Sequence, residues 1–332
     1  MSMIKTDSTV RGARIRRTMG TVSDYGHGIS AIDGAYLRPL LMAVHAIVEG
    51  DRAALVDPGT NASVPLILDA LAAKGIRPGQ VDYVILTHIH LDHAGGSGLL
   101  MQKLPNATLT VHPRGARHMA DPTRLVAGTI GVYGEAETRR LYGDILPVPA
   151  ARIRETPDGA SIHLNGRELA FHETFGHARH HVAIHDSASG HVFAGDTFGL
   201  SYPELDWRGR RFAFATSSPT QFDPAPYHRS LDLIAGLARG AVYVTHYGQV
   251  GDLEARLATL HRQVDALAEL GRRKNDAGPA RRERLWAGVK AILLDEVRRY
   301  GAPFTEAQVM AAYGQDVDLN ADGLVAWLDS AR

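Results

Sequence analysis

Cysteine is absent from this chain of 332 residues. Its absence excludes disulfide bonds, zinc sites built on thiolates and thiol nucleophiles. The chain also lacks an apolar run of the roughly 18 residues that a membrane-spanning helix needs. Residues 1–20 contain no apolar stretch typical of a secretory signal. We therefore expect a cytoplasmic protein that does not enter a membrane.

A net charge is lacking as well, because 36 lysines and arginines balance 36 aspartates and glutamates. Proteins that bind polymeric nucleic acid usually carry a basic excess or a basic face. Anionic membrane surfaces likewise attract basic segments. The balance therefore favours a small-molecule substrate over nucleic acid or a membrane as the partner.

Apolar periodicity in the first 250 residues predicts an alternation of strands and helices, which is typical of a layered α/β fold. The expected strands lie at residues 37–50, 51–59, 81–87, 107–112, 161–166, 168–174, 181–186, 191–196 and 241–246. The expected helices lie at residues 64–76, 98–104 and 225–238 and over much of 113–145. The segment between residues 197 and 223 is expected to be irregular.

The segment THIHLDHAGG, residues 87–96, places three histidines and an aspartate within six positions. Histidine is the commonest metal ligand among side chains. In an extended segment, residues i and i+2 point the same way, so His88 and His90 can reach one ion. Asp92 and His93 follow where two glycines permit a turn, so they can face a second ion beside the first.

Further ligand-type residues stand at the ends of short apolar runs, beside small residues. They are Asp57 in VDPG, His177 in GHARHH, Asp196 in AGDT and His246 in THYG. A carboxylate can bridge two metal ions, and Asp196 is the candidate for that position. The first ion would then have His88, His90 and His177, and the second would have Asp92, His93 and His246. Nitrogen and oxygen ligands without sulfur predict two divalent ions, Zn²⁺ in the first place, with iron or manganese as alternatives.

In this order, these motifs resemble the metallo-β-lactamase-fold hydrolase superfamily over residues 37–248. The resemblance implies an αββα sandwich, in which two mixed sheets face each other with helices outside and the metal ions at one edge. It also implies that Asp196 bridges the two ions and that Asp57 supports the ligands from behind. We expect His181 to lie beside the ligands as a further supporting group.

Departures from the patterns of particular family members narrow the range of possible activities. β-Lactamases of this fold usually have a cysteine in the second metal site, and this chain has none. Glyoxalase II usually follows the bridging aspartate with Gly-Cys-Gly-Arg, where this chain reads GDTFGLSYPELDW. Diiron oxygen-reducing flavoproteins usually have glutamate at the position of His90. Residues 112–126 and 216–234 are similar to a poorly characterised microbial branch of the superfamily.

The leading hypothesis is a dinuclear metal-dependent hydrolase of a small ester, thioester or lactone, with a metal-bridging hydroxide as the nucleophile. Its expected catalytic residues are Asp92, Asp196 and Tyr247. Its expected substrate pocket uses the aromatic side chains of the irregular segment, namely Tyr202, Trp207, Phe212 and Phe214. Two alternatives stay open: a mononuclear-iron enzyme that oxidises a persulfide, and a phosphodiesterase.

The expected organisation is an irregular segment at 1–20, a metallo-β-lactamase-fold domain at 21–250 and a helical extension at 251–332. Helical periodicity at 253–267 suits a helix that covers the sandwich or pairs with a second copy, so a homodimer is one expectation. Residues 318–329 also fit a calcium-loop template that ends on Asp329. The preferred interpretation is a helix N-cap there, followed by a final helix packed through Leu324, Trp327 and Leu328.

Overall fold

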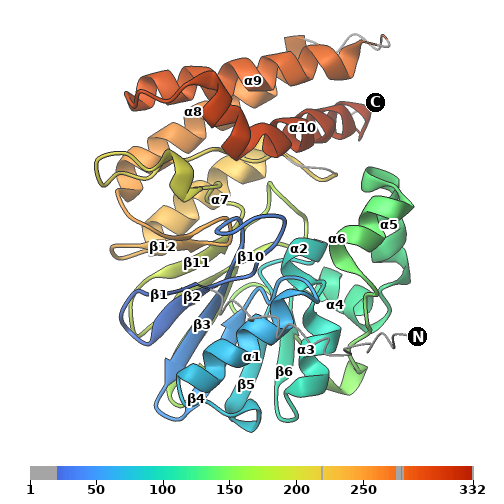
Figure 1. Ribbon diagram of the computed structural model, residues 1–332, viewed down its shortest axis with the longest axis vertical. Coiled ribbons are helices and arrows are strands. Elements are labelled where there is room, and N and C mark those ends of the chain that lie inside the picture. Colours follow the sequence, from blue (N-terminus) through green and yellow to red (C-terminus); the bar gives the residue numbers. More distant parts are fainter. Residues whose placement is uncertain (1–20, 218–219, 274–277, 279, 331–332) are drawn as a thin grey trace, which may run out of the picture.

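The computed structural model describes residues 21–217, 220–273, 278 and 280–330. Two β-sheets face each other, and helices cover their outer faces (Figure 1). The strand order is β1-β2-β3-β4-β5-β6-β7 in the first sheet and β13-β12-β11-β10-β9-β8 in the second. Both sheets contain parallel and antiparallel pairs, so the expected αββα sandwich is confirmed.

The strands are short and mostly buried. The first sheet consists of β1 (Val22–Asp24), β2 (Ile29–Asp33), β3 (Ala43–Glu49), β4 (Arg52–Val56), β5 (Val81–Ile85), β6 (Thr108–Val111) and β7 (Ile153–Glu155). The second consists of β8 (Ser161–Leu164), β9 (Arg167–Glu173), β10 (Val182–Asp186), β11 (Val192–Gly195), β12 (Val242–Val244) and β13 (Gly248–Val250). The sequence predicts β3 to β6 and β8 to β12. It misses β1, β2, β7 and β13; β1, β7 and β13 are only three residues long, and the five residues of β2 are all buried and show no alternation.

The helices follow the sequence pattern more closely. They are α1 (Ser63–Ala73), α2 (Leu91–Ala94), α3 (Ser97–Lys103), α4 (Pro113–Ala120), α5 (Thr123–Tyr133), α6 (Glu135–Tyr142), α7 (Pro224–Leu237), α8 (Leu253–Arg273), α9 (Arg281–Tyr300) and α10 (Glu306–Ser330). Three 3-10 turns, η1 (Pro78–Gln80), η2 (Ala150–Arg152) and η3 (Pro203–Leu205), complete the described elements. Asp223 caps the start of α7 by accepting the backbone N–H of Ala225 at 3.2 Å.

The core between the two sheets is made of aliphatic and aromatic side chains from both of them. Ile47 and Ile85 of the first sheet belong to one buried cluster with Phe171, Phe193 and Tyr243 of the second. Burying a side chain of this size stabilises the fold by about 1.5–3 kcal/mol. The strand ends, and hence the loops that leave them, are therefore fixed by a packed interior.

The C-terminal helices α8, α9 and α10 lie together across one end of the sandwich (Figure 1). Tyr313 of α10 is fully buried, and its hydroxyl accepts the backbone N–H of Tyr202 at 3.1 Å. Its ring also lies 4.6 Å from that of Tyr202, measured between centroids. The extension is thus anchored on the irregular segment. The domain boundary near residue 250 stays a prediction.

Residues 318–329 do not form the loop of the calcium template, the less favoured interpretation, because they lie inside α10. Asp322 instead forms an ion pair with Arg282 of α9, with Oδ2 and Nη2 3.0 Å apart. The N-cap interpretation is wrong too, since the helix already begins at Glu306. Leu324 and Leu328 are buried, as expected.

Residues 1–20, expected to be irregular, lie outside the described part of the chain. Among the residues that the structure describes, no helix is both long enough and apolar enough to cross a membrane.

Two loops are joined by backbone hydrogen bonds beside the histidine segment. The backbone N–H of Gly96 donates to the carbonyl of Gly59 at 2.7 Å, and the N–H of Gly59 donates to the carbonyl of His93 at 2.9 Å. A Cβ at Gly96 would lie 2.5 Å from the carbonyl oxygen of Thr60. The close approach of these two loops therefore requires glycine at position 96.

Gly96→Ala should lower the free energy of unfolding by about 1–3 kcal/mol, because the added methyl group must push two backbone segments apart. Gly131→Ala is the matched control, since a Cβ there meets nothing within 4 Å and alanine favours the helix by roughly 0.5–1 kcal/mol. Chemical denaturation of both variants checks this. Equal stability of the two would contradict the close-approach argument.

Candidate metal centre

The expected ligands lie at one edge of the sandwich. Strands β9, β11 and β12 run in the same direction, so their carboxyl ends share one edge of the second sheet. His177 follows β9, Asp196 follows β11 directly, and His246 lies just beyond β12. The backbone N–H of Val182 donates to the carbonyl of Thr87 at 2.8 Å, which joins this edge to the histidine segment after β5.

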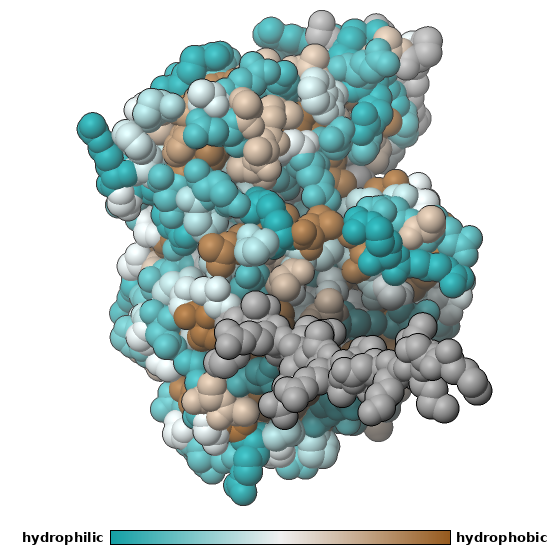
Figure 2. All heavy atoms as spheres, viewed as in Figure 1, coloured by the Kyte–Doolittle hydropathy of each residue, from teal (hydrophilic) through white to brown (hydrophobic). Residues whose placement is uncertain are grey.

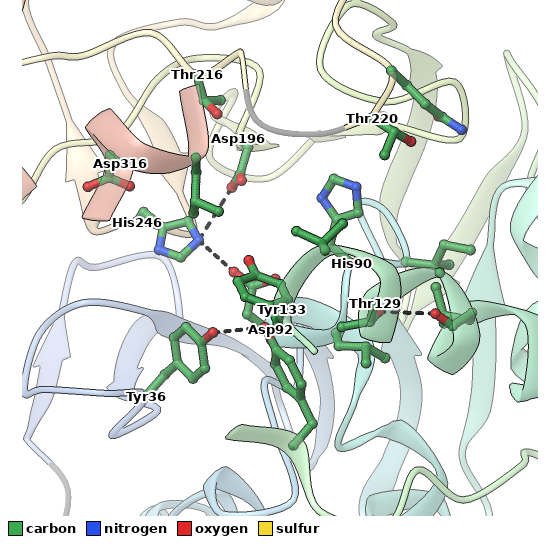
Figure 3. A pocket seen from close by; sticks show the side chains of 18 of the residues that line it. Tyr36, His90, Asp92, Thr129, Tyr133, Asp196, Thr216, Thr220, His246 and Asp316 are labelled. Carbon is green, nitrogen blue, oxygen red and sulfur yellow. Dashed lines mark hydrogen bonds and ion pairs between the residues drawn. The ribbon is translucent and has the colours of Figure 1, made fainter. Parts of the chain in front are cut away.

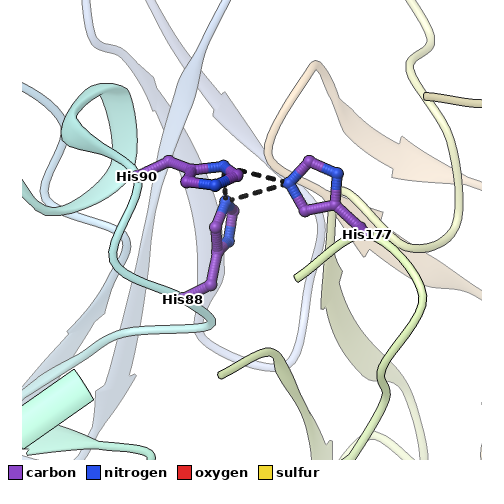
Figure 4. A group of neighbouring side chains, drawn as sticks. All are labelled: His88, His90 and His177. Atoms are coloured by element: carbon purple, nitrogen blue, oxygen red, sulfur yellow. Dashed lines mark hydrogen bonds between the residues drawn. The ribbon is translucent and has the colours of Figure 1, made fainter. Parts of the chain in front are cut away.

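Three imidazole nitrogens converge in the first group (Figure 4). The distances are 2.9 Å from His88 Nε2 to His90 Nδ1, 3.1 Å from His177 Nε2 to His90 Nδ1, and 3.3 Å from His177 Nε2 to His88 Nε2. Ligands in a tetrahedron around zinc, each about 2.0–2.1 Å from the ion, lie about 3.3 Å apart. The three nitrogens therefore have the spacing of three corners of a tetrahedral site.

Asp92 joins His93 and His246 in the second group, and Figure 3 shows Asp92, Asp196 and His246 of this region. Asp92 Oδ2 lies 3.3 Å from His246 Nε2 and 3.7 Å from His93 Nε2. Asp196 stands between the groups. Its Oδ1 lies 3.3 Å from His93 Nε2, and its Oδ2 lies 3.6 Å from His177 Nε2. One oxygen of Asp196 thus faces each group, which is the placement expected of a bridging carboxylate.

The electrostatics of the site suit cations. Burial lowers the pKa of His90, and it lowers the pKa of His88 and His177 well below the usual range, so all three rings are neutral and keep a free lone pair. Burial alone would raise the pKa of Asp196, but His93 and His246 hold it well below its usual range. The carboxylate is therefore ionised.

Two buried atoms at the centre lack hydrogen bonds. Within the described residues, His93 Nε2 and Asp196 Oδ1 have no hydrogen-bond partner, although they lie 3.3 Å apart. Buried polar atoms in native proteins are nearly always satisfied by a partner, a water or an ion. Divalent ions among these nitrogen and oxygen atoms would satisfy both, so the residues present fit the expected metals.

Asp57 lies behind the ligands, where the sequence predicts a supporting carboxylate. Its Oδ1 accepts the backbone N–H of Thr87 at 2.8 Å. Its Oδ2 accepts the hydroxyls of Thr87 and Thr245, each at 2.7 Å, and lies 2.9 Å from His93 Nδ1. This contact keeps a proton on Nδ1 of His93 and leaves Nε2 to face the metal position.

His181 also supports the site. Its Nε2 accepts the backbone N–H of Asp196 at 3.3 Å, so its proton lies on Nδ1, which donates to the hydroxyl of Thr174 at 2.8 Å. Burial lowers the pKa of His181 to about 3. The neutral ring thus holds the backbone of the bridging residue in place and is not itself positioned as a ligand.

A cavity of about 290 Å³ opens above the second group of ligands, with His90, Asp92, Asp196 and His246 on its floor. Helix α5 forms one wall and α10 the opposite wall (Figure 3). The molecular outline in Figure 2 is notched between these two helices, and hydrophobic side chains lie along the notch. A small organic molecule in this cavity would therefore lie directly on the ligand set.

The sequence correctly places Tyr202 at this cavity, but three other aromatic expectations are wrong. Trp207, Phe212 and Phe214 are absent from the cavity's lining in the described part of the chain. Their rings pack on the C-terminal helical region instead: Trp207 on Phe304, Phe212 on Tyr300 and Phe214 on Tyr313. Burial under the extension thus accounts for these aromatic residues.

The expectation for Tyr247 is also wrong. Its side chain packs in a small buried cluster with Ala31 and Ala43, between β2 and β3. It does not belong to the lining of the cavity in the described residues. The phenols that do reach the cavity are Tyr36, Tyr133, Tyr142 and Tyr202.

Several cavity residues escape sequence reasoning altogether. Helix α5 contributes Arg124, Leu125, Thr129, Val132 and Tyr133, and α10 contributes Gln315, Asp316, Leu319 and Asn320. The sequence carries one signal, the apolar run TRLVAGTIGVY of α5. In the structure, none of these residues is fully buried. An apolar helix without a buried residue is typical of a binding wall. For α10 the sequence carries no comparable signal.

A sequence model of the metallo-β-lactamase superfamily matches residues 42–246. The chain belongs to this superfamily. The matched residues include every ligand of the two groups and Asp57. The expected family membership is thereby confirmed.

Curated proteins that resemble this chain include hydroxyacylglutathione hydrolases. The protein of Xanthomonas campestris pv. campestris (strain B100) is 31% identical over 155 residues, which are 46% of this chain and 45% of that protein. The protein of Aeromonas hydrophila is 28% identical over 194 residues, 58% of this chain and 56% of that protein. The chain thus spans about half the length of the curated relatives that it matches.

Solved structures of the superfamily share the fold over most of this chain. An archaeal superfamily protein from Sulfolobus tokodaii has a TM-score of 0.61 at 18% identity, covering 90% of this chain and 98% of that one. A family protein from Thermus thermophilus has a TM-score of 0.58 at 21% identity, covering 92% and 94%. At this identity the likeness establishes the fold alone.

Asp57→Asn should lower metal affinity by about 10–100-fold, because an amide cannot accept from all four donors and turns an N–H₂ group toward at least one of them. Asp232→Asn, at an exposed position of α7, is the control. Competition with a chromophoric chelator measures the affinity. An unchanged affinity would show that His93 needs no orientation by Asp57.

Asp316 of α10 lines the cavity above the ligands, and its carboxyl group titrates near neutral pH. The hydroxyl of Tyr202 donates to its Oδ1 at 3.2 Å. Burial raises the pKa of Asp316 to about 7, against the opposing effects of His246 and Tyr202. The folded protein therefore binds the proton of this carboxyl more tightly than the unfolded chain does.

In metal-free protein, the contribution of Asp316 to the free energy of unfolding should fall as pH rises from about 4 to about 7, because ionising this largely desolvated carboxyl group opposes folding. Asp316→Asn should remove this loss, so its advantage over the parent grows to at most about 4 kcal/mol near pH 7 and then levels off. Urea unfolding at four pH values measures it. Asp329→Asn, exposed on the same helix, is the control, and parallel curves for Asp316→Asn and the parent would refute the assignment.

Proposed function

We propose that this chain is a dinuclear metal-dependent hydrolase of a small ester, thioester or lactone. The observation that carries the proposal is the pair of ligand groups with Asp196 between them, open on one side to a cavity. His88, His90 and His177 would hold one ion, and Asp92, His93 and His246 the other. Divalent ions bound there would activate a water molecule at neutral pH and polarise the substrate's carbonyl oxygen.

The protein's own side chains bind and orient the substrate. Leu125 and Val132 of α5 and Leu319 of α10 give the cavity apolar walls above the polar floor. An apolar acyl group fits between them, and its carbonyl group then lies on the ligand set. At about 290 Å³, the cavity is at the small end of ligand sites. The substrate is therefore small.

Tyr36 and Tyr142, rather than Tyr247, offer phenol hydroxyls in the cavity. Their hydroxyl oxygens lie 2.8 Å apart, and both residues line the cavity. Burial, together with the nearby charge of Asp92, raises the pKa of both phenols, so they stay protonated at neutral pH. One of the two hydroxyls is then available to donate a hydrogen bond to an oxygen that gains negative charge during hydrolysis.

The second ligand group supports two ions over one. Asp92 and His246 lie 3.3 Å apart, and neither contributes an atom to the first group. A mononuclear site would leave the orphaned His93 Nε2 unexplained. The names of the curated relatives support a thioester among the possible substrates, whereas the absence of Gly-Cys-Gly-Arg after Asp196 argues against a glutathione thioester.

The cytoplasmic location, the possible homodimer and the absence of a nucleic-acid partner stay predictions from composition and periodicity. The division at residues 20 and 250 is likewise proposed from the sequence.

Metal analysis of protein purified without added metal should give two ions per chain, zinc or zinc with iron. His246→Ala should lower the content to about one ion and reduce hydrolysis of a thioester, ester and lactone panel by at least about 100-fold. His163→Ala, an exposed histidine of β8, should change neither. One iron per chain, with persulfide oxidation and no hydrolysis, would favour the oxygenase alternative. Cleavage of bis(p-nitrophenyl) phosphate alone would favour the phosphodiesterase.

A further inference from the structure

A second cavity, of about 460 Å³, lies apart from the metal centre, between the irregular segment and helices α8 and α9. Five arginines line it, Arg210, Arg211, Arg256, Arg262 and Arg299, against only two acidic residues, Asp252 and Glu296. In a chain whose total charge is balanced, this is a local excess of positive charge. A cavity with such a lining attracts anions.

Glu296, one of the two acidic residues that line this arginine cavity, already contacts two of its arginines. Arg262 Nε donates to Glu296 Oε1 at 2.9 Å, and Arg299 Nε lies 3.8 Å from the same oxygen. Arg210 stacks on Tyr300, with its guanidinium carbon 4.7 Å from the ring centroid, and donates to that residue's carbonyl. Arg211 is paired with Asp206, with Nε 3.3 Å from Oδ2, so in the described part of the chain Arg210 and Arg256 are the arginines of this cavity without an ion pair.

Arg256, in the first turns of α8, is the unusual member. It is only 5% exposed, and no carboxylate of the described residues forms an ion pair with it. Its Nε donates to the carbonyl of Phe198 at 3.1 Å and its Nη1 to the hydroxyl of Ser201 at 3.3 Å. Its Nη2 is buried and has no hydrogen-bond acceptor in the described part of the chain.

Burying a guanidinium group that donates only to two neutral oxygens opposes folding. Removing a charge from water costs several kcal/mol unless an opposite charge or a full set of hydrogen bonds compensates it. Burial lowers the pKa of Arg256 to about 10, which still leaves the group protonated at neutral pH. The fold therefore keeps a buried cation with one donor to spare, beside a cavity that other cations line.

We propose that the arginine cavity binds a small organic anion, with Arg256 as the buried contact and the arginines at positions 210 and 299 at the rim. The ligand carries a phosphate or a carboxylate, the two groups that the planar fork of arginine recognises by paired hydrogen bonds. The cavity has room for an organic body beside the charged group. This site is separate from the metal-bound substrate position and does not depend on the hydrolase assignment.

The test is calorimetric titration of the metal-loaded full chain at low chloride concentration, with inorganic phosphate and benzoate as the two probes. Binding of at least one probe is expected, and it should weaken as chloride is added. Arg256→Gln should weaken it about ten-fold or more, the range expected when a charged hydrogen-bond partner is lost. Binding of phosphate alone or of benzoate alone supports the site and identifies the recognised group.

Double variants of exposed arginines test the proposal even if Arg256→Gln fails to fold. Arg210→Gln/Arg299→Gln removes two exposed cations of the cavity and should also weaken binding. Arg282→Gln/Arg298→Gln removes two exposed arginines of α9 outside the cavity and should leave binding unchanged. His246→Ala should leave it unchanged as well. The proposal is overturned if neither probe binds at millimolar concentration, or if His246→Ala abolishes binding while the rim variant retains it.

Discussion

The buried carboxylate of Asp57 is the contact on which the metal centre depends. It lies at the end of β4 and accepts hydrogen bonds from the segment after β5 and from the segment after β12, so it ties the two sheets together at the ligand edge. A buried carboxylate without such donors would cost several kcal/mol. Because all its partners must be in place at once, the same interaction fixes the loop positions and the orientation of His93.

The sandwich and the helices outside it contribute different parts of the candidate site. The sandwich holds the ligands, since His88, His177, Asp196 and His246 all follow its strands. The walls of the cavity come instead from α5 and α10, which contribute no ligand. With the proposed function, metal binding would therefore depend on the part of the chain that the family shares, whereas substrate choice would depend largely on two helices packed outside it.

The sequence could bring the candidate ligands to one edge because His88, His177, Asp196 and His246 stand near the ends of short apolar runs, and such runs become buried strands. The same local reasoning placed Trp207, Phe212 and Phe214 at the substrate. It failed because Tyr313, about one hundred residues further along the chain, returns to pack over Phe214. Periodicity reports which face of a segment is apolar. It does not report which distant segment covers that face, and so the positions of Tyr36, Tyr142 and Asp316 at the cavity needed the structure.

The segment from Phe198 to Tyr202 connects the two cavities. Leu200 and Tyr202 line the metal cavity, while the carbonyl of Phe198 and the hydroxyl of Ser201 hold Arg256 on the other side. The backbone N–H of Ser201 also donates to the carbonyl of His246, and Asp196 lies only two residues before Phe198. The same short segment therefore forms part of one cavity wall and supplies the two oxygens that hold Arg256 at the other cavity.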